Sequence, residues 1–196
     1  MADEASKNLE DLNVNDPSTN YKAPAQKTLD DINKLDADDP SLVKYKQALL
    51  GDMSEVAYDK DDPRKVIVTS VEIHSPELSA PKVIKITKDD KEVEKVKIKE
   101  GALFHVEVIY YVQHEIVSGL KYEQTVKCKG IKVDSDSVMI GSYGPRKENY
   151  TYKSTEEEAA KGMLARQSYN VKSRFVDDDK VCHVSWEWKF EISKDW

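Results

Sequence analysis

The sequence predicts an all-β protein, an immunoglobulin-like antiparallel β-sandwich preceded by a flexible N-terminal arm with short helices. Two observations indicate the sandwich: apolar and polar residues alternate from residue 66 onward, and turn signals recur about every 8–12 residues. The arm is indicated by the first third of the chain, which contains neither Trp nor Phe.

The charge of the chain is divided unevenly. Residues 1–62 carry 15 acidic and 7 basic side chains, a net charge of −8, whereas residues 63–196 carry 22 acidic and 23 basic side chains, a net charge of +1. High charge with low hydrophobicity is typical of segments that do not fold alone. We therefore predict a boundary between an acidic regulatory arm, 1–62, and a sandwich domain, 63–196. A plain solubilising tail is the alternative interpretation of the arm.

Two stretches of the arm, 28–35 and 39–51, nevertheless have helix signals. In the second, Asp39 is placed to cap the helix, Pro40 occupies the favoured first helical position and Gly51 ends the run. Its apolar stripe consists of Leu42, Tyr45 and Leu49. A helix of about 12 residues is marginal in water, so we expect the arm to fold when it binds something.

The rest of the chain divides into short strands. We predict them at 66–73, 82–87, 92–99, 102–112, 121–128, 137–140, 168–176 and 183–192. The acidic turn 177–180 joins the last two as a hairpin. All three tryptophans follow Cys182, so the Cys…Trp…Cys order of antibody domains is missing and a true immunoglobulin domain is excluded.

The last predicted strand, H-V-S-W-E-W-K-F-E-I, alternates strictly between polar and apolar residues. Trp186 and Trp188 therefore share one inward face with Phe190. Two tryptophans on one face either fill an ordinary core or wall a cavity for a ligand.

Catalytic patterns are missing from the sequence. The four histidines are scattered along the chain without the close His or Cys partners of a zinc site, so we predict no metal. Segment 141–146 has two glycines but lacks the Lys-Ser/Thr of a P-loop. The nearly neutral second part argues against nucleic acid. We expect a binding protein rather than an enzyme, with no catalytic residues and no cofactor.

The predicted location is cytoplasmic. No apolar run is long enough to span a bilayer, and the N-terminus lacks the apolar core of a secretory signal. Without secretion, Cys128 and Cys182 are expected to be free, buried thiols.

Seven strings are more particular than generic strand. They are N-Y-K-A-P-A-Q-K (20–27), K-Y-K-Q-A-L-L-G (44–51), E-I-V-S-G-L-K-Y (115–122), I-G-S-Y-G-P-R (140–146), K-G-M-L-A-R (161–166), K-S-R-F-V-D-D-D-K (172–180) and S-W-E-W (185–188). Together they resemble the Rho GDP-dissociation inhibitors, in order from about Asn20 to Trp196.

The resemblance implies a carrier and inhibitor. Such proteins extract prenylated Rho- and Rac-type GTPases from membranes, hold GDP in place and shield the geranylgeranyl group between the two sheets. The arm, at about 28–51, would fold as a helical hairpin over the GTPase switch regions. The expected partner is a prenylated, preferably GDP-bound GTPase, in a 1:1 complex with a monomer of this chain.

Site residues follow from matching positions. The resemblance implies an isoprenyl pocket formed by Ile73, Val96, Phe104, Ile116, Leu164, Val171, Trp186 and Trp188. It implies switch contacts by Asp39, Ser41, Tyr45, Leu49 and Leu50, and contact with a basic GTPase tail by Glu157 and Glu158. Plainer interpretations are core packing for the pocket set, helix capping for Asp39 and Ser41, and a solvated loop for the glutamates.

Two alternative functions keep the same fold. One is a general carrier of prenylated or acylated proteins without control of nucleotide release; the switch-binding arm argues against it. The other is an adhesive or interaction sandwich with a disordered tail. The lack of a signal peptide and the inward tryptophan pair argue against that one.

Overall fold

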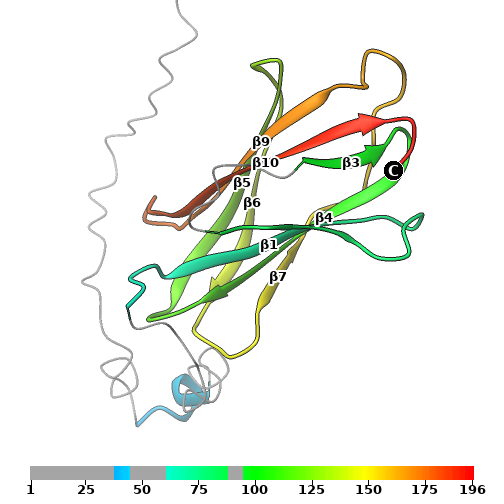
Figure 1. Cartoon of the computed structure of the whole chain (residues 1–196). Helices are drawn as coiled ribbons and strands as arrows, with labels where there is room; N and C mark the ends of the chain where they lie inside the picture. The colour runs from blue at the N-terminus through cyan, green and yellow to red at the C-terminus, as the bar shows by residue number, and fades with distance from the viewer. Residues whose placement is uncertain (1–37, 45–60, 88–94) are drawn as a thin grey trace, which may run out of the picture.

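The computed structural model describes residues 38–44, 61–87 and 95–196, and it confirms the predicted all-β class. Two sheets face each other as the layers of a sandwich (Figure 1). Within the described residues, the first sheet has the order β2 (Lys82–Lys85), β1 (Val66–His74), β4 (Leu103–Val112) and β7 (Tyr150–Lys153), with β8 (Glu157–Glu158) also paired to β4. The second has the order β3 (Lys95–Lys99), β10 (Cys182–Ser193), β9 (Ser168–Val176), β5 (Val117–Cys128) and β6 (Ile131–Tyr143).

The second sheet departs from a purely antiparallel arrangement at its edge. β3 pairs with β10 in parallel, with Phe190 opposite Val96 and Ile192 opposite Ile98. β9 and β10 form the predicted antiparallel hairpin around residues 177–181. The C-terminal strand therefore lies between β3 and β9.

Over the described residues, the predictions differ from the structure by more than two residues at four strands, the first being β5, which begins at Val117 rather than at residue 121. β6 begins at Ile131, well before the predicted 137–140, because its first half, I-K-V-D-S-D, is exposed and has only two apolar residues. β7 and β8 were not predicted, since each is too short to establish a period. Edge strands need only backbone pairing on one side, so they can carry such sequences.

The alternation of apolar and polar residues noted in the sequence matches the burial along the strands. Along β4, every second residue from Val106 to Val112 is buried, and along β9 the buried residues are Val171, Ser173 and Phe175. Phe175 is fully buried, and its ring centroid lies 4.8 Å from that of Tyr110 and 5.4 Å from that of Trp186. Aromatic rings at these separations attract one another beyond their burial. This cluster joins the two sheets.

Side-chain hydrogen bonds hold the residues that precede β1 in place. The buried carboxylate of Asp62 accepts hydrogen bonds from Arg64, with Nη2 2.7 Å and Nε 3.0 Å away. The Gln113 amide donates to the carbonyls of Asp62 and Arg64 at 3.0 and 2.7 Å. Residues 62–64 are thus bonded to the end of β4. The predicted domain boundary at 62/63 is not tested by these contacts and stays a prediction.

In the arm, the structure describes a helix at 40–44 with the predicted cap. The Asp39 carboxylate accepts hydrogen bonds from the backbone N–H groups of Ser41 at 2.8 Å and Leu42 at 3.3 Å. Pro40 occupies the first helical position, where a missing N–H is harmless. The predicted helix at 28–35 and the rest of 39–51 lie outside the described residues.

Both cysteines are free, as expected, but the prediction that both are buried was wrong. Cys128 is half-buried and Cys182 is exposed. Cys182 precedes a register irregularity between Cys182 and Val184 in the pairing of β9 and β10, so the alternation of the tryptophan strand does not extend to it. Among the described residues, no helix is long and apolar enough to cross a membrane.

The aromatic cluster should carry much of the stability of the sandwich. We expect Phe175→Ala to lower the free energy of unfolding by about 3–5 kcal/mol, as truncation of a fully buried Phe usually does. Phe104→Ala, at a half-buried position, should cost less than half as much. Urea denaturation measures both, and equal losses would contradict the assignment.

Candidate functional site

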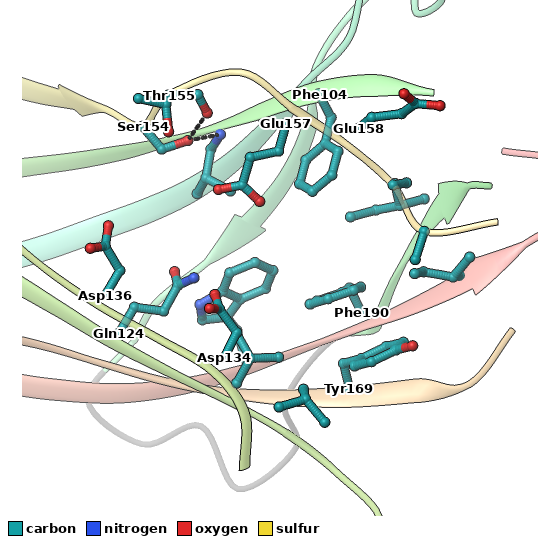
Figure 2. Close-up of a pocket in the computed structure, with 18 of the residues that line it drawn as sticks. Phe104, Gln124, Asp134, Asp136, Ser154, Thr155, Glu157, Glu158, Tyr169 and Phe190 are labelled. Atoms are coloured by element: carbon teal, nitrogen blue, oxygen red, sulfur yellow. Dashed lines mark hydrogen bonds between the residues drawn. The ribbon is translucent and has the colours of Figure 1, made fainter. Parts of the chain in front are cut away.

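A cavity of about 260 Å³ lies between the two sheets (Figure 2). Strands of both layers line it, including β4 and β7 from the first sheet and β5, β6, β9 and β10 from the second. Figure 2 shows Phe104 on one side and Tyr169 and Phe190 on the other. The cavity therefore lies where the inward faces of the two layers are not in full contact.

Aromatic rings form much of the wall. Tyr169 and Phe190 stack with centroids 4.8 Å apart and planes 9° from parallel, and Trp188 lies 5.8 Å from Phe190. Tyr122 and Tyr152 come from opposite sheets, and their ring centroids lie 4.7 Å apart. Aliphatic lining comes from Ile98, Val106, Val126 and Ile192. These flat, apolar walls suit a hydrophobic ligand.

A chain of hydrogen bonds satisfies the polar atoms behind this wall. The Trp188 indole N–H donates to Ser173 Oγ at 3.2 Å, and Ser173 Oγ lies 3.0 Å from the Tyr122 hydroxyl. That hydroxyl donates to Gln124 Oε1 at 2.7 Å. Burial raises the pKa of Tyr122 above its ordinary value, so the group remains a neutral donor at physiological pH. The indole ring of Trp188 is thus held in one orientation.

One part of the cavity lining is acidic. Asp134 and Asp136 on β6 and Glu157 and Glu158 on β8 belong to it, and we call these four residues the acidic rim. In Figure 2 the Glu157 carboxylate points into the cavity, whereas Glu158 points away. Glu158 pairs instead with the Lys161 ammonium.

Glu157 is a member of the acidic rim whose pKa is raised. Although its side chain is exposed, loss of hydration against neighbouring atoms raises its pKa, and the carboxylates of Asp134 and Asp136 raise it further. The Ser154 hydroxyl, which accepts from the Val106 N–H at 2.9 Å and donates to the Thr155 carbonyl at 3.0 Å, fixes the segment before β8 (Figure 2). The rim thus concentrates negative charge that a cation would relieve.

The loop between β8 and β9 is held by an ion pair at its base and exposes apolar side chains at its tip. Arg166 makes a two-point ion pair with Glu100, with Nη2 2.7 Å and Nε 3.0 Å away, and this holds the pKa of Glu100 below its usual range. At the tip, Met163 is 80% and Leu164 is 92% exposed. Large apolar side chains this exposed are typical of interaction surfaces.

The residues predicted for the pocket are divided between cavity, core and surface. Phe104 and Trp188 line the cavity. Four others are buried in the core and are not part of its lining, namely Ile73, Val96, Val171 and Trp186. Ile116 is half-buried in the connection between β4 and β5, and Leu164 lies on the exposed loop.

The two tryptophans therefore occupy different surroundings. Trp188 borders the cavity, whereas Trp186 packs into the core against Phe175 and Tyr122. Within the described part of the chain, the buried indole N–H of Trp186 has no acceptor. One tryptophan walls the cavity in this structure, and the other fills the core beside it.

Several lining residues were not singled out from the sequence. Tyr169 lies in the predicted strand 168–176 but was not assigned to the pocket, and Tyr152 belongs to a strand that was not predicted. The alternation of β5 could have indicated Tyr122 and Val126, because both share its inward face. Gln124 is on that face too, and it completes the hydrogen-bond chain.

The predicted switch-contact residues are only partly described. Asp39 and Ser41 are exposed, and Asp39 is engaged in capping the helix. Tyr45, Leu49 and Leu50 lie outside the described residues.

Comparison with known proteins assigns the family. A family model described as "RHO protein GDP dissociation inhibitor" matches residues 4–195. Human Rho GDP-dissociation inhibitor 1 is 46% identical, with the match covering 100% of this chain and 94% of the human protein. The chain belongs to the Rho GDP-dissociation inhibitor family.

Other relatives of this inhibitor family are more distant. A probable rho GDP-dissociation inhibitor of Caenorhabditis elegans is 39% identical over 95% of this chain and 98% of its own length. Mouse Rho GDP-dissociation inhibitor 3 is 40% identical over 90% of this chain and 78% of its own length. These relatives are named as inhibitors and not as enzymes.

The raised pKa of Glu157 predicts a stability effect with a definite sign. Its charged form is disfavoured in the folded state, so it destabilises the fold at neutral pH, and the penalty disappears as the pH falls through the raised pKa and below the ordinary value near 4.3. Glu157→Gln should therefore raise the Tm at pH 7, by at most about 4 °C, because exposed charge interactions are worth below about 1 kcal/mol.

Thermal unfolding at pH 7 and pH 4 tests this. The gain should be absent at pH 4. Glu156→Gln is a matched control, because Glu156 is a neighbouring exposed glutamate that is not part of the cavity lining. A lower Tm for Glu157→Gln at pH 7 would contradict the prediction.

Proposed function

We propose that this protein binds prenylated Rho- and Rac-type GTPases, takes their geranylgeranyl group between its sheets, extracts them from membranes and slows GDP release. The observation that carries the proposal is an apolar, aromatic-walled cavity with an acidic rim in a member of the Rho GDP-dissociation inhibitor family. It acts as a cytoplasmic carrier in a 1:1 complex, without enzymatic activity.

Lipid burial supplies the driving force. At ~0.8 kcal/mol per buried CH₂, sequestering about ten lipid carbons contributes roughly 8 kcal/mol, comparable to the hold of a single-chain membrane anchor. The cavity of about 260 Å³ is below the range of about 300–1,000 Å³ usual for ligand pockets. A twenty-carbon chain therefore requires the sheets to separate further than they do here.

Such separation would recruit residues that are now core. Val96, Val171 and Trp186 lie on the inward faces of β3, β9 and β10 next to cavity-lining neighbours, and Ile73 lies on the opposite sheet. The unsatisfied N–H of Trp186 means that moving its ring breaks no hydrogen bond within the described residues. Ile116 and the exposed Leu164 would close over the ends of the chain.

The acidic rim would provide a contact surface for the prenylated tail of the GTPase. A basic segment before the lipid would bring cations to Glu157 and Glu158 as the lipid enters beside them. Loss of hydration, and then the carboxylates of Asp134 and Asp136, raise the pKa of Glu157, so a cation beside it would stabilise its charged form. Complementary charge of this kind also speeds association.

The arm would control the release of GDP from the GTPase. We propose that Asp39 and Ser41 meet the switch regions with Tyr45, while Leu49 and Leu50 dock the helix. A carboxylate facing a switch hydroxyl or backbone amide would resist the opening through which GDP leaves. The alternative, a lipid-binding carrier without such control, predicts lipid-dependent binding with unchanged GDP release.

The cavity can be tested with adjacent substitutions on β4. Phe104→Gln puts an amide into the lining, where it would be buried against the lipid, whereas Leu103→Gln puts the same group on the opposite, exposed face. Affinity for a prenylated Rho-family GTPase should fall more than about tenfold, or about 1.4 kcal/mol, for Phe104→Gln only. Binding of the unprenylated GTPase should be the same for both variants. Equal affinity of the wild-type protein for both forms of the GTPase would exclude the lipid site.

The arm can be tested at its cap. Asp39→Ala removes both charge and cap, whereas Asp39→Asn removes the charge and keeps a good N-cap. If the carboxylate contacts the switch regions, both variants lose most of the inhibition of GDP release while retaining prenyl-dependent binding. Rescue by Asn would assign the effect to helix capping, and wild-type inhibition by Asp39→Ala would remove Asp39 from the mechanism. Asp38→Ala is the neighbouring control.

A further inference from the structure

Two histidines that are distant in sequence become neighbours on the outer face of the first sheet. His74 ends β1 and is the register partner of His105 on β4, and Glu72 is the partner of Glu107. Between them Ile73 and Val106 point into the core, so the four polar side chains share the opposite face. The prediction of no metal site was based on sequence spacing, which does not report this pairing.

The polar atoms of these side chains converge. His74 Nε2 lies 3.0 Å from Glu72 Oε2 and 3.6 Å from Glu107 Oε2, and His105 Nε2 lies 3.1 Å from Glu107 Oε1. One ligand atom from each of His74, His105 and Glu107 can be chosen so that all three lie within 4.8 Å of one another. Zn–N and Zn–O bonds of about 2.0–2.2 Å in a tetrahedron place ligand atoms about 3.3–3.5 Å apart.

The remaining adjustment is small and local. The two imidazole rings stack with centroids 5.0 Å apart and planes 12° from parallel. Turning one ring about its side-chain bonds brings its nitrogen toward the other without moving the strands. All four side chains are partly buried, with exposed fractions between 13% and 27%, so they are held in place yet open to an ion from solvent.

We propose that His74, His105 and Glu107, with Glu72 as the fourth ligand, bind a divalent transition-metal ion of the zinc class. Two neutral imidazoles with carboxylates form a donor set that suits Zn²⁺ and disfavours Mg²⁺ and Ca²⁺, which prefer oxygen ligands alone. The Lys153 ammonium lies 4.0 Å from Glu107 Oε1 and is 61% exposed, so it can move away when the ion enters.

The ion would cross-link β1 and β4 next to the cavity. His105 follows Phe104, which faces the cavity, and the same stretch of β4 pairs with β8 in the acidic rim. Metal binding would therefore stiffen the sheet that must move when the cavity opens. The metal site itself does not depend on the proposed GTPase function, because it can be measured without a GTPase.

Isothermal titration of the full chain with Zn²⁺ tests the site. The background is Cys128→Ser with Cys182→Ser, which removes the thiols as competing ligands. We expect one saturable Zn²⁺ per chain, with affinity falling at least about tenfold in His74→Gln and in His105→Gln, since loss of even an outer-shell partner costs about 10–100-fold. Glu107→Gln should weaken binding as well.

The matched control is His183→Gln. His183 is also paired with a carboxylate, Asp177 at 2.7 Å, but it lies in the other sheet, so its loss should leave zinc affinity unchanged. Thermal unfolding without metal checks that each variant folds, and Zn²⁺ should raise the Tm of the wild-type protein but not of His74→Gln.

Co²⁺ provides a second, spectroscopic readout. A visible absorption band of four-coordinate Co²⁺, displaced by Zn²⁺ but not by excess Mg²⁺, would support the site. Zinc affinity that is unaffected by both histidine substitutions, or absence of saturable binding, would overturn the proposal.

Discussion

The structure depends on how closely its two sheets approach each other. At one end the rings of Tyr110, Phe175 and Trp186 fill the space between the layers. Further along β10, Trp188 and Phe190 face a cavity instead. The same alternating strand thus contributes to a packed core and to the wall of a cavity. The packed end holds the layers together, whereas the other end leaves space between them.

The cavity wall combines rigidity with room for a ligand. Its polar side chains from the Trp188 indole to Gln124 are joined by hydrogen bonds through Ser173 and Tyr122. A ligand therefore meets an apolar wall whose polar groups are already paired and need no water. The charged side chains of the described lining are those of the acidic rim, where negative charge is concentrated. An amphiphile with an apolar chain and a cationic neighbour matches both features.

Local patterns predicted most of the fold because strand periodicity is a local property. The alternation in β10 correctly placed Trp186, Trp188 and Phe190 on one inward face, and the burial along β4 and β9 alternates in the same way. It did not distinguish Trp186 from Trp188, because whether an inward residue meets a partner or a void depends on the opposite sheet. Likewise, the pairing of His74 with His105 depends on the register between β1 and β4. Short or polar edge strands, such as β8, have too few residues to show a period.

The parallel pairing of β10 with β3 has a consequence for how the protein is made. Ile192 and Ser193, close to the C-terminus, are bound in register to Ile98 and Lys99, which are synthesised long before them. Until residues 182–193 have left the ribosome, β9 and β3 lack the strand that lies between them. The layer that holds most of the cavity wall is therefore completed only once β10 has been synthesised, and this long-range pairing makes folding slower. Before β10 is in place, the edges of β3 and β9 that will pair with it are open, and unpaired strand edges of this kind are prone to aggregation.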